Sequence, residues 1–76
     1  MAKGSKTSGK SFSQALREAR QEKGISQEEL ADRAGLHRTY ISQIERGLKS
    51  PSLRSLEQIA QALGMSTATL LGRMER

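Results

Sequence analysis

The sequence contains no cysteine, no valine, one histidine (His37) and only two aromatic residues, Phe12 and Tyr40. The lack of cysteine excludes disulfides, thiolate zinc sites and thiol nucleophiles. One histidine cannot build a histidine metal cluster, and two aromatics are too few for the stacking surfaces that bind single strands or RNA. No apolar run is long enough to span a membrane. We therefore expect a cytoplasmic protein that is not an enzyme and has no metal, cofactor or small-molecule site.

The apolar residues that are present are mostly leucine and alanine, which favour helices over strands. A length of 76 residues allows one small domain. Residues 1–11 carry three lysines and no acid, and they have too few apolar side chains to offset the entropy of ordering. The sequence thus predicts a mobile basic tail over 1–11 and an all-α domain over 12–76.

Glycines at positions 24, 35, 47, 64 and 72 each follow a segment with helical apolar spacing. A glycine just beyond a helix adopts the left-handed conformation that ends it, so five short helices are expected. Their approximate ranges are 12–23, 27–34, 38–46, a segment after Ser52 and a segment after Ser66. Ser26 and Glu29 predict a capping box in which each side chain bonds the other residue's amide. The fourth helix is expected to bury Leu53, Leu56, Ile59, Ala60 and Leu63.

The segment from Gln27 to Ile44 has the spacing of a helix-turn-helix. Counted from Gln27, Ala31 is fifth, Gly35 ninth, Ile41 fifteenth and Ile44 eighteenth. Two closely crossing helices need a small residue at the crossing, a tight turn needs a positive φ, and the second helix needs aliphatic anchors. The second and third expected helices therefore form the motif.

Residues 25–66 resemble the Cro/repressor (XRE) family, whose phage-repressor-like domain has five helices. The run HRTYISQIERG is similar to controller proteins of restriction–modification systems. The resemblance implies a sequence-specific regulator of transcription that binds double-stranded DNA as a homodimer on a palindromic operator. It further implies an autoregulator of bacterial or phage origin, associated with the nucleoid and with RNA polymerase as a further partner. An antitoxin that binds a toxin as well as DNA is the alternative.

The family places the third helix in the major groove, which implies a base-reading role for its outward face. Arg38 suits guanine O6 and N7 through its planar fork, and Gln43 suits adenine. A solvated helix face would carry the same polar residues, so that alternative stays open. The base-reading candidates are Arg38, Thr39, Ser42 and Gln43.

Contacts to the DNA backbone are expected where helices begin, because free amides and the positive dipole end attract phosphate. Gln27 matches the family's usual phosphate clamp. The ring of Tyr40 could instead seal the core, and Lys49 and Arg54 could be ordinary surface cations. The full set is Ser26, Gln27, His37, Tyr40, Arg46, Lys49, Ser50, Ser52 and Arg54.

The resemblance also implies one structural ion pair and one dimer surface. Arg20 and Glu45 match a family pair that fixes the reading helix against the first helix. The last helix carries more apolar surface than a short helix hides, which suggests a two-fold interface, although all its apolar residues could face inward. The expected interface residues are Met65, Leu70, Leu71 and Met74.

The positive charge is unevenly distributed along the chain. The net charge is +5, of which residues 1–11 hold +3, residues 12–32 hold −2, residues 33–54 hold +4 and the remainder is neutral. The only acid in 33–54 is Glu45. The charge that matters for an anionic partner therefore lies in the second half of the motif.

Overall fold

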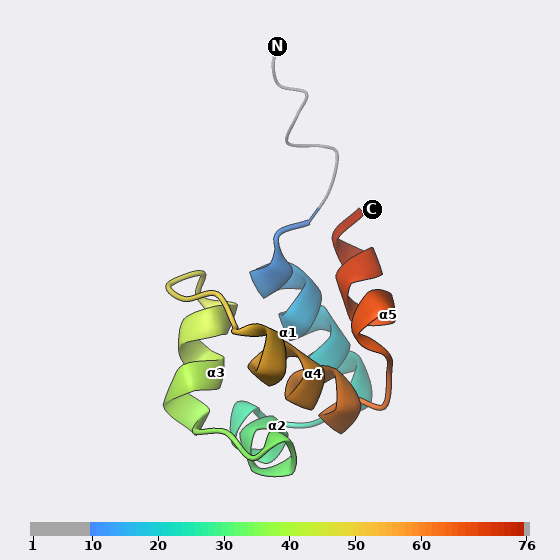
Figure 1. Ribbon diagram of the computed structural model, residues 1–76. Coiled ribbons are helices and arrows are strands. Elements are labelled where there is room, and N and C mark those ends of the chain that lie inside the picture. Colours follow the sequence, from blue (N-terminus) through green and yellow to red (C-terminus); the bar gives the residue numbers. More distant parts are fainter. Residues whose placement is uncertain (1–9, 76) are drawn as a thin grey trace.

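The computed structural model describes residues 10–75, which form five α-helices and a final 3-10 turn (Figure 1). The elements are α1 (Phe12–Lys23), α2 (Gln27–Ala34), α3 (Arg38–Glu45), α4 (Leu53–Ala62), α5 (Thr67–Gly72) and η2 (Arg73–Glu75). The described range contains no strand, and the predicted all-α fold of five helices is confirmed.

Most of the predicted basic tail, residues 1–9, lies outside the described residues. Its last two residues contact the domain: Lys10 forms an ion pair with Glu18, and Ser11 caps α1. The Lys10 amide also donates to the Met74 carbonyl at 2.9 Å, so the start of the described chain is joined to η2.

Serine side chains start four of the five helices. Ser11, Ser26, Ser52 and Ser66 each accept a hydrogen bond from the amide three residues later. Only half of the predicted capping box forms. The Ser26 hydroxyl accepts from the Glu29 amide at 3.0 Å, but the Glu29 carboxylate accepts from Arg33 Nε at 2.8 Å. The expected return bond from Glu29 to the start of the helix was wrong because Arg33, one turn later, offers a charged donor.

Glycines end the first four helices as predicted, with φ of 73–76° at Gly24, Gly35, Gly47 and Gly64. Gly35 makes the tight turn between α2 and α3. The expectation for Gly72 was wrong: it is the last residue of α5 and has no positive φ. The chain does not reverse there but tightens into η2, which needs no left-handed residue.

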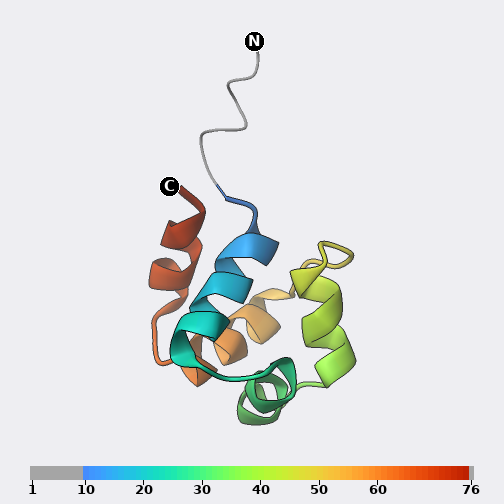
Figure 2. The same cartoon turned by 180° about the vertical axis from the view of Figure 1, so that it is seen from behind.

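Figures 1 and 2 show α1 and α4 in the middle of the domain, with α3 on one side and α5 on the other. Helix α2 packs against α3 and α4, while α1 contacts α3 and α5. Reading and dimerisation candidates therefore lie on opposite flanks. Both α3 and α5 pack on α1.

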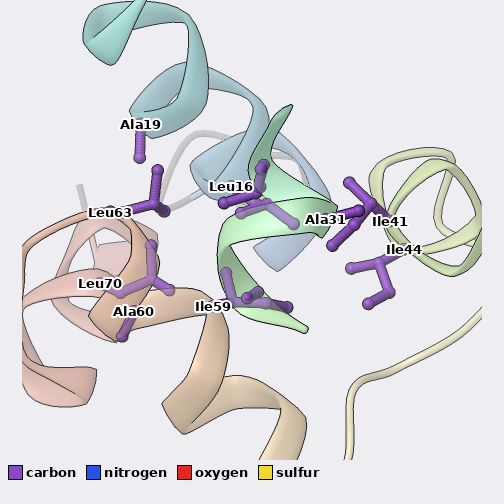
Figure 3. Packing of buried hydrophobic residues seen from close by; sticks show 11 residues of the cluster. Leu16, Ala19, Ala31, Ile41, Ile44, Ile59, Ala60, Leu63 and Leu70 are labelled. Carbon is purple, nitrogen blue, oxygen red and sulfur yellow. The ribbon is translucent and has the colours of Figure 1, made fainter. Parts of the chain in front are cut away.

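The core is a single cluster to which every α-helix contributes (Figure 3). Ala31 of α2 lies beside Ile41 of α3, where its small side chain permits the close crossing predicted from the sequence. The buried members are Leu16, Ala19, Leu30, Ala31, Ala34, Ile41, Ile44, Ile59, Ala60, Leu63 and Leu70.

Leu53 departs from the predicted core. Its side chain is 70% exposed, whereas Ile59 and Leu63 of the same helical face are buried and Leu56 is half-buried. Leu53 is the first residue of α4 and lies one turn before Leu56, beyond the edge of the core. Helical periodicity placed it on the correct face, but no neighbouring element covers that end.

The contrast between Leu30 and Leu53 predicts the stability of two matched variants. Leu30→Ala removes a fully buried side chain and should lower the free energy of unfolding by about 2–5 kcal/mol. Leu53→Ala makes the same chemical change at an exposed position and should stay within about 0.5 kcal/mol of wild type. Urea unfolding followed by circular dichroism measures both. Equal losses in the two variants would contradict the burial assigned here.

Candidate nucleic-acid interface

Helix α3 has one buried face and one open face. Ile41 and Ile44 are buried in the core. On the other side, Arg38 and Thr39 are exposed, while Ser42 and Gln43 are half-buried. The four predicted base-reading residues thus lie together on α3 away from its anchors, with the first two most open to an incoming partner.

The start of α3 differs from the other helix starts. Its N-cap residue, His37, has extended backbone geometry and an exposed side chain that makes no capping hydrogen bond. The first turn of α3 also contains no acidic residue. The positive end of this helix is therefore not neutralised by its own side chains, which suits it to an anionic partner.

The structure joins Arg20 and Glu45, the pair expected from the sequence, in a two-pronged ion pair. Arg20 Nε lies 2.6 Å from Glu45 Oε2, and Arg20 Nη2 lies 2.9 Å from Oε1. The two side chains are only 13% and 2% exposed. The hydrogen bond to Glu45 raises the pKa of Arg20 above its ordinary value, so the guanidinium stays charged. A third guanidinium nitrogen donates to the Ile25 carbonyl at 2.9 Å, which leaves the buried cation well satisfied.

Gln27, the predicted phosphate clamp, is half-buried at the start of α2. Its Nε2 donates to Glu45 Oε1 at 3.0 Å. The amide nitrogen carries two protons, so this bond orients the side chain and leaves one donor for another acceptor. Ser26 beside it is exposed and occupied as the cap of α2.

The ion pair also determines the charge of this face. Glu45 is turned inward and neutralised by Arg20, so the single acid of residues 33–54 does not reach the surface. The remaining charged side chains of 37–54 are all basic and exposed. They are Arg38, Arg46, Lys49 and Arg54.

Tyr40 links α3 to the start of α4. Its ring packs partly against the core, and its hydroxyl oxygen accepts from the Ser52 amide at 3.3 Å. Hydrogen bonding from Ser55, and then from Ser52, lowers the pKa of the Tyr40 hydroxyl. The ring therefore seals the core while the hydroxyl holds the α4 cap, and the phenolic proton remains available to an acceptor. Ser50 and Ser52 are exposed on the same connection.

Two residues of this region, Arg17 and Leu48, had no predicted role, and a third, Leu53, was predicted to be buried. Arg17 of α1 donates from Nη2 to the Glu45 backbone carbonyl at 2.7 Å. The only signal for it was position: Arg17 precedes Arg20 by three residues, so the two share a helical face. Leu48 and Leu53 are 61% and 70% exposed, and they place apolar side chains among the cations of the α3–α4 connection.

The predicted dimer surface needs one correction. Leu70 is completely buried in the core of its own domain, so it has no surface to offer a second copy. Met65 and Met74 are half-buried, and Leu71 is 39% exposed. The partly open apolar residues at this end of the domain are therefore Met65, Leu71 and Met74.

Helices α2 and α3 cross at Ala31 and are joined by the turn at Gly35, and α3 exposes a polar face from its start. This arrangement is that of a DNA-binding helix-turn-helix domain. The helix-turn-helix family model matches residues 16–70, and the chain belongs to this XRE-type family of transcription regulators. It is 49% identical over 61 residues to the control protein C.BamHI of Bacillus amyloliquefaciens, covering 79% of this chain and 75% of that protein. It is 44% identical over 59 residues to the regulator SinR of Bacillus subtilis, covering 76% of this chain and 53% of SinR.

Two solved structures show the same arrangement of helices. The restriction–modification controller C.AhdI from Aeromonas hydrophila superposes with a TM-score of 0.76 at 44% identity, covering 78% of this chain and 89% of that one. The DNA-binding domain of the P22 c2 repressor superposes with a TM-score of 0.75 at 30% identity, covering 79% of each chain. The predicted Cro/repressor fold is confirmed.

The buried ion pair leads to a stability prediction with an internal control. Glu45→Ala leaves the Arg20 guanidinium buried without its counter-charge, and we expect it to lower the free energy of unfolding by about 3 kcal/mol. Glu29→Ala removes the same kind of carboxylate from the exposed pair with Arg33, where the loss should be below about 1 kcal/mol. Thermal unfolding measures both variants. A Glu45→Ala protein as stable as wild type would show that the pair does not hold α3 in place.

Proposed function

We propose that this chain is a sequence-specific transcription regulator that binds double-stranded DNA as a homodimer on a palindromic operator. The proposed role is that of an autoregulator of the restriction–modification controller type, cytoplasmic and nucleoid-associated, with RNA polymerase as a further partner. The DNA-binding domain proposed here is residues 12–76, to which Lys10 and Ser11 are joined. Members of the family are generally not enzymes, and we propose no catalytic activity here. No helix in residues 10–75 is long and apolar enough to cross a membrane.

The observation that carries this proposal is the electrostatic separation around Glu45. Because its carboxylate faces inward to Arg20, the outward face from α3 to the start of α4 presents only basic charged side chains. Phosphate contacts supply affinity and base contacts supply sequence preference. On this face, Arg46, Lys49 and Arg54 contact the phosphates of the DNA backbone. Arg38 contacts a base, together with the other base-reading residues.

In the proposed complex, residues that contact DNA phosphates flank the base-reading residues of α3 in the sequence. Ser26 and Gln27 bring the start of α2 to one phosphate, and Ser50 and Ser52 bring the α3–α4 connection to another, with α3 between them. Tyr40 and His37 lie at the edges of α3 and contribute a hydroxyl and an imidazole to the backbone set. Thr39, Ser42 and Gln43 complete the base-reading set.

The controller role is supported by the relatives, which include restriction–modification controllers, and not by a feature of the site itself. No specific observation favours the antitoxin alternative. A palindromic operator follows from a two-fold dimer, whose reading helices lie about one helical turn of DNA apart.

Selection of bound sites from random duplex DNA tests the function directly. The wild-type protein should enrich a palindrome whose half-sites are separated by about 10 base pairs. Binding to the enriched duplex should weaken steeply with salt, since several phosphates are neutralised. A salt-dependent affinity without any enriched sequence would reject sequence-specific regulation and leave only non-specific binding.

Two single variants separate base reading from backbone binding. Arg38→Ala should weaken binding to the enriched duplex by about 1–3 kcal/mol and relax selection at a guanine, while binding to the scrambled duplex falls only by the smaller loss of one cation. Lys49→Ala should weaken binding to both duplexes alike and reduce the salt slope by about 1. Fluorescence anisotropy at several salt concentrations gives both quantities. Equal loss on the two duplexes for Arg38→Ala would show that Arg38 does not read bases.

The dimer proposal rests on Met65, Leu71 and Met74. Leu71→Arg introduces two cations across the proposed two-fold axis and should produce monomers that bind the full site weakly. Leu48→Arg makes the same change at a more exposed leucine far from α5 and should leave the oligomeric state unchanged. Sedimentation velocity compares the two proteins. An intact dimer in Leu71→Arg would place the interface elsewhere.

A further inference from the structure

One backbone carbonyl at the C-terminal end of α3 receives its hydrogen bond from a side chain of another helix. The last four carbonyls of any α-helix lack partners within the helix. In α3, the Ser42 carbonyl accepts from the Arg46 amide at 3.0 Å, the Ile44 carbonyl from Gly47 at 3.0 Å and the Gln43 carbonyl from Leu48 at 2.8 Å. The turn that follows α3 therefore satisfies three of the four.

The fourth carbonyl, that of Glu45, accepts from Arg17 Nη2 of α1 at 2.7 Å. The donor is charged, so the bond is stronger than a neutral one and also opposes the negative end of the helix dipole. The last turn of α3 has no basic residue of its own. Arg17 thus brings a cation from α1 directly onto the last carbonyl of α3, next to the C-cap residue Arg46.

A second contact places the same face of α1 against the turn after α3. A Cβ built at Gly47 would lie 3.5 Å from Ser13 Oγ. Ser13, Arg17 and Arg20 are spaced as one face of α1. That face lies against the α3–α4 turn at Ser13 and bonds the last carbonyl of α3 and the Glu45 carboxylate through the two arginines.

We propose that Arg17 is a positioning residue for DNA reading. Its hydrogen bond to the Glu45 carbonyl fixes the position of the last turn of α3 and of the first residues of the α3–α4 connection. This inference rests on the proposed function. Arg20 fixes the side chain of Glu45, whereas Arg17 fixes its backbone, from which Arg46 and Gly47 continue. Arg17 touches no base in this role and acts through the placement of α3.

Loss of Arg17 should affect specific binding more than non-specific binding. Bidentate base contacts require donors to be held within a fraction of an ångström, whereas phosphate contacts tolerate displacement. Charge alone predicts a different result, because removal of one cation weakens binding to every duplex equally.

The test compares Arg17→Met with Arg17→Lys, which keeps a charged donor, and with Arg33→Met, which removes the same charge from an exposed pair on α2. The probes are the duplex enriched by the wild-type protein and a scrambled duplex. Arg17→Met should lose about tenfold in affinity for the enriched duplex beyond the loss of Arg33→Met, with no excess loss on the scrambled duplex. Arg17→Lys should recover most of it. Parallel losses on both duplexes would overturn the proposal.

A measurement on the DNA-free protein keeps this inference separate from the proposed function. Amide hydrogen exchange in Arg17→Met should accelerate at Arg46, Gly47 and Leu48 while the amides of α4 keep wild-type rates. Uniform acceleration would mean that Arg17 only stabilises the whole domain, and unchanged rates would mean that it does not hold the turn. Either result overturns the inference. If the wild-type protein enriches no duplex but the local acceleration is found, the proposed function fails and the positioning of the turn stands, without its role in reading.

Discussion

The placement of α3 depends on one buried carboxylate. Glu45 receives two hydrogen bonds from Arg20 of α1 and one from Gln27 of α2, so side chains of three helices meet at a single group. Burying a carboxylate and a guanidinium costs desolvation energy, which is recovered only when their geometry and remaining hydrogen bonds are well satisfied. Arg20 meets that condition through its third bond to the Ile25 carbonyl. The pair fixes the orientation of α3 more strictly than apolar packing alone, because hydrogen bonds are directional.

The Glu45 carboxylate also determines where the exposed positive charge lies, because it is the only acid of residues 33–54 and it is buried. A net charge of +5 gives no location for an anionic partner, and the acids of residues 12–32 outnumber the bases there. With Glu45 turned inward, the exposed charged side chains of residues 37–54 are all basic. One contact thus supports both the orientation of α3 and the positive charge of the side chains around it, so an acid is tolerated within the helix-turn-helix motif.

Residue patterns predicted the elements whose causes are local, and the family resemblance predicted the distant Arg20–Glu45 pair. Neither predicted burial or bonds that depend on other distant neighbours. Ser26, Ala31 and Gly35 act through a cap, a crossing and a turn that span a few residues, and the structure places all three as expected. Leu53 and Leu70 were misassigned in opposite directions, since helical periodicity gives a face but not the element that covers it. The bond of Arg17 to a backbone carbonyl on another helix has no sequence pattern at all, because any residue at position 45 offers that carbonyl.

The burial of Leu70 has a consequence for assembly. A domain this small needs most of its apolar residues for its own core, and α5 gives its most buried side chain to that purpose. What remains partly open at this end of the domain is Leu71, with Met65 and Met74 half-buried. On the proposed dimer, these three side chains supply the apolar part of the contact between the two subunits.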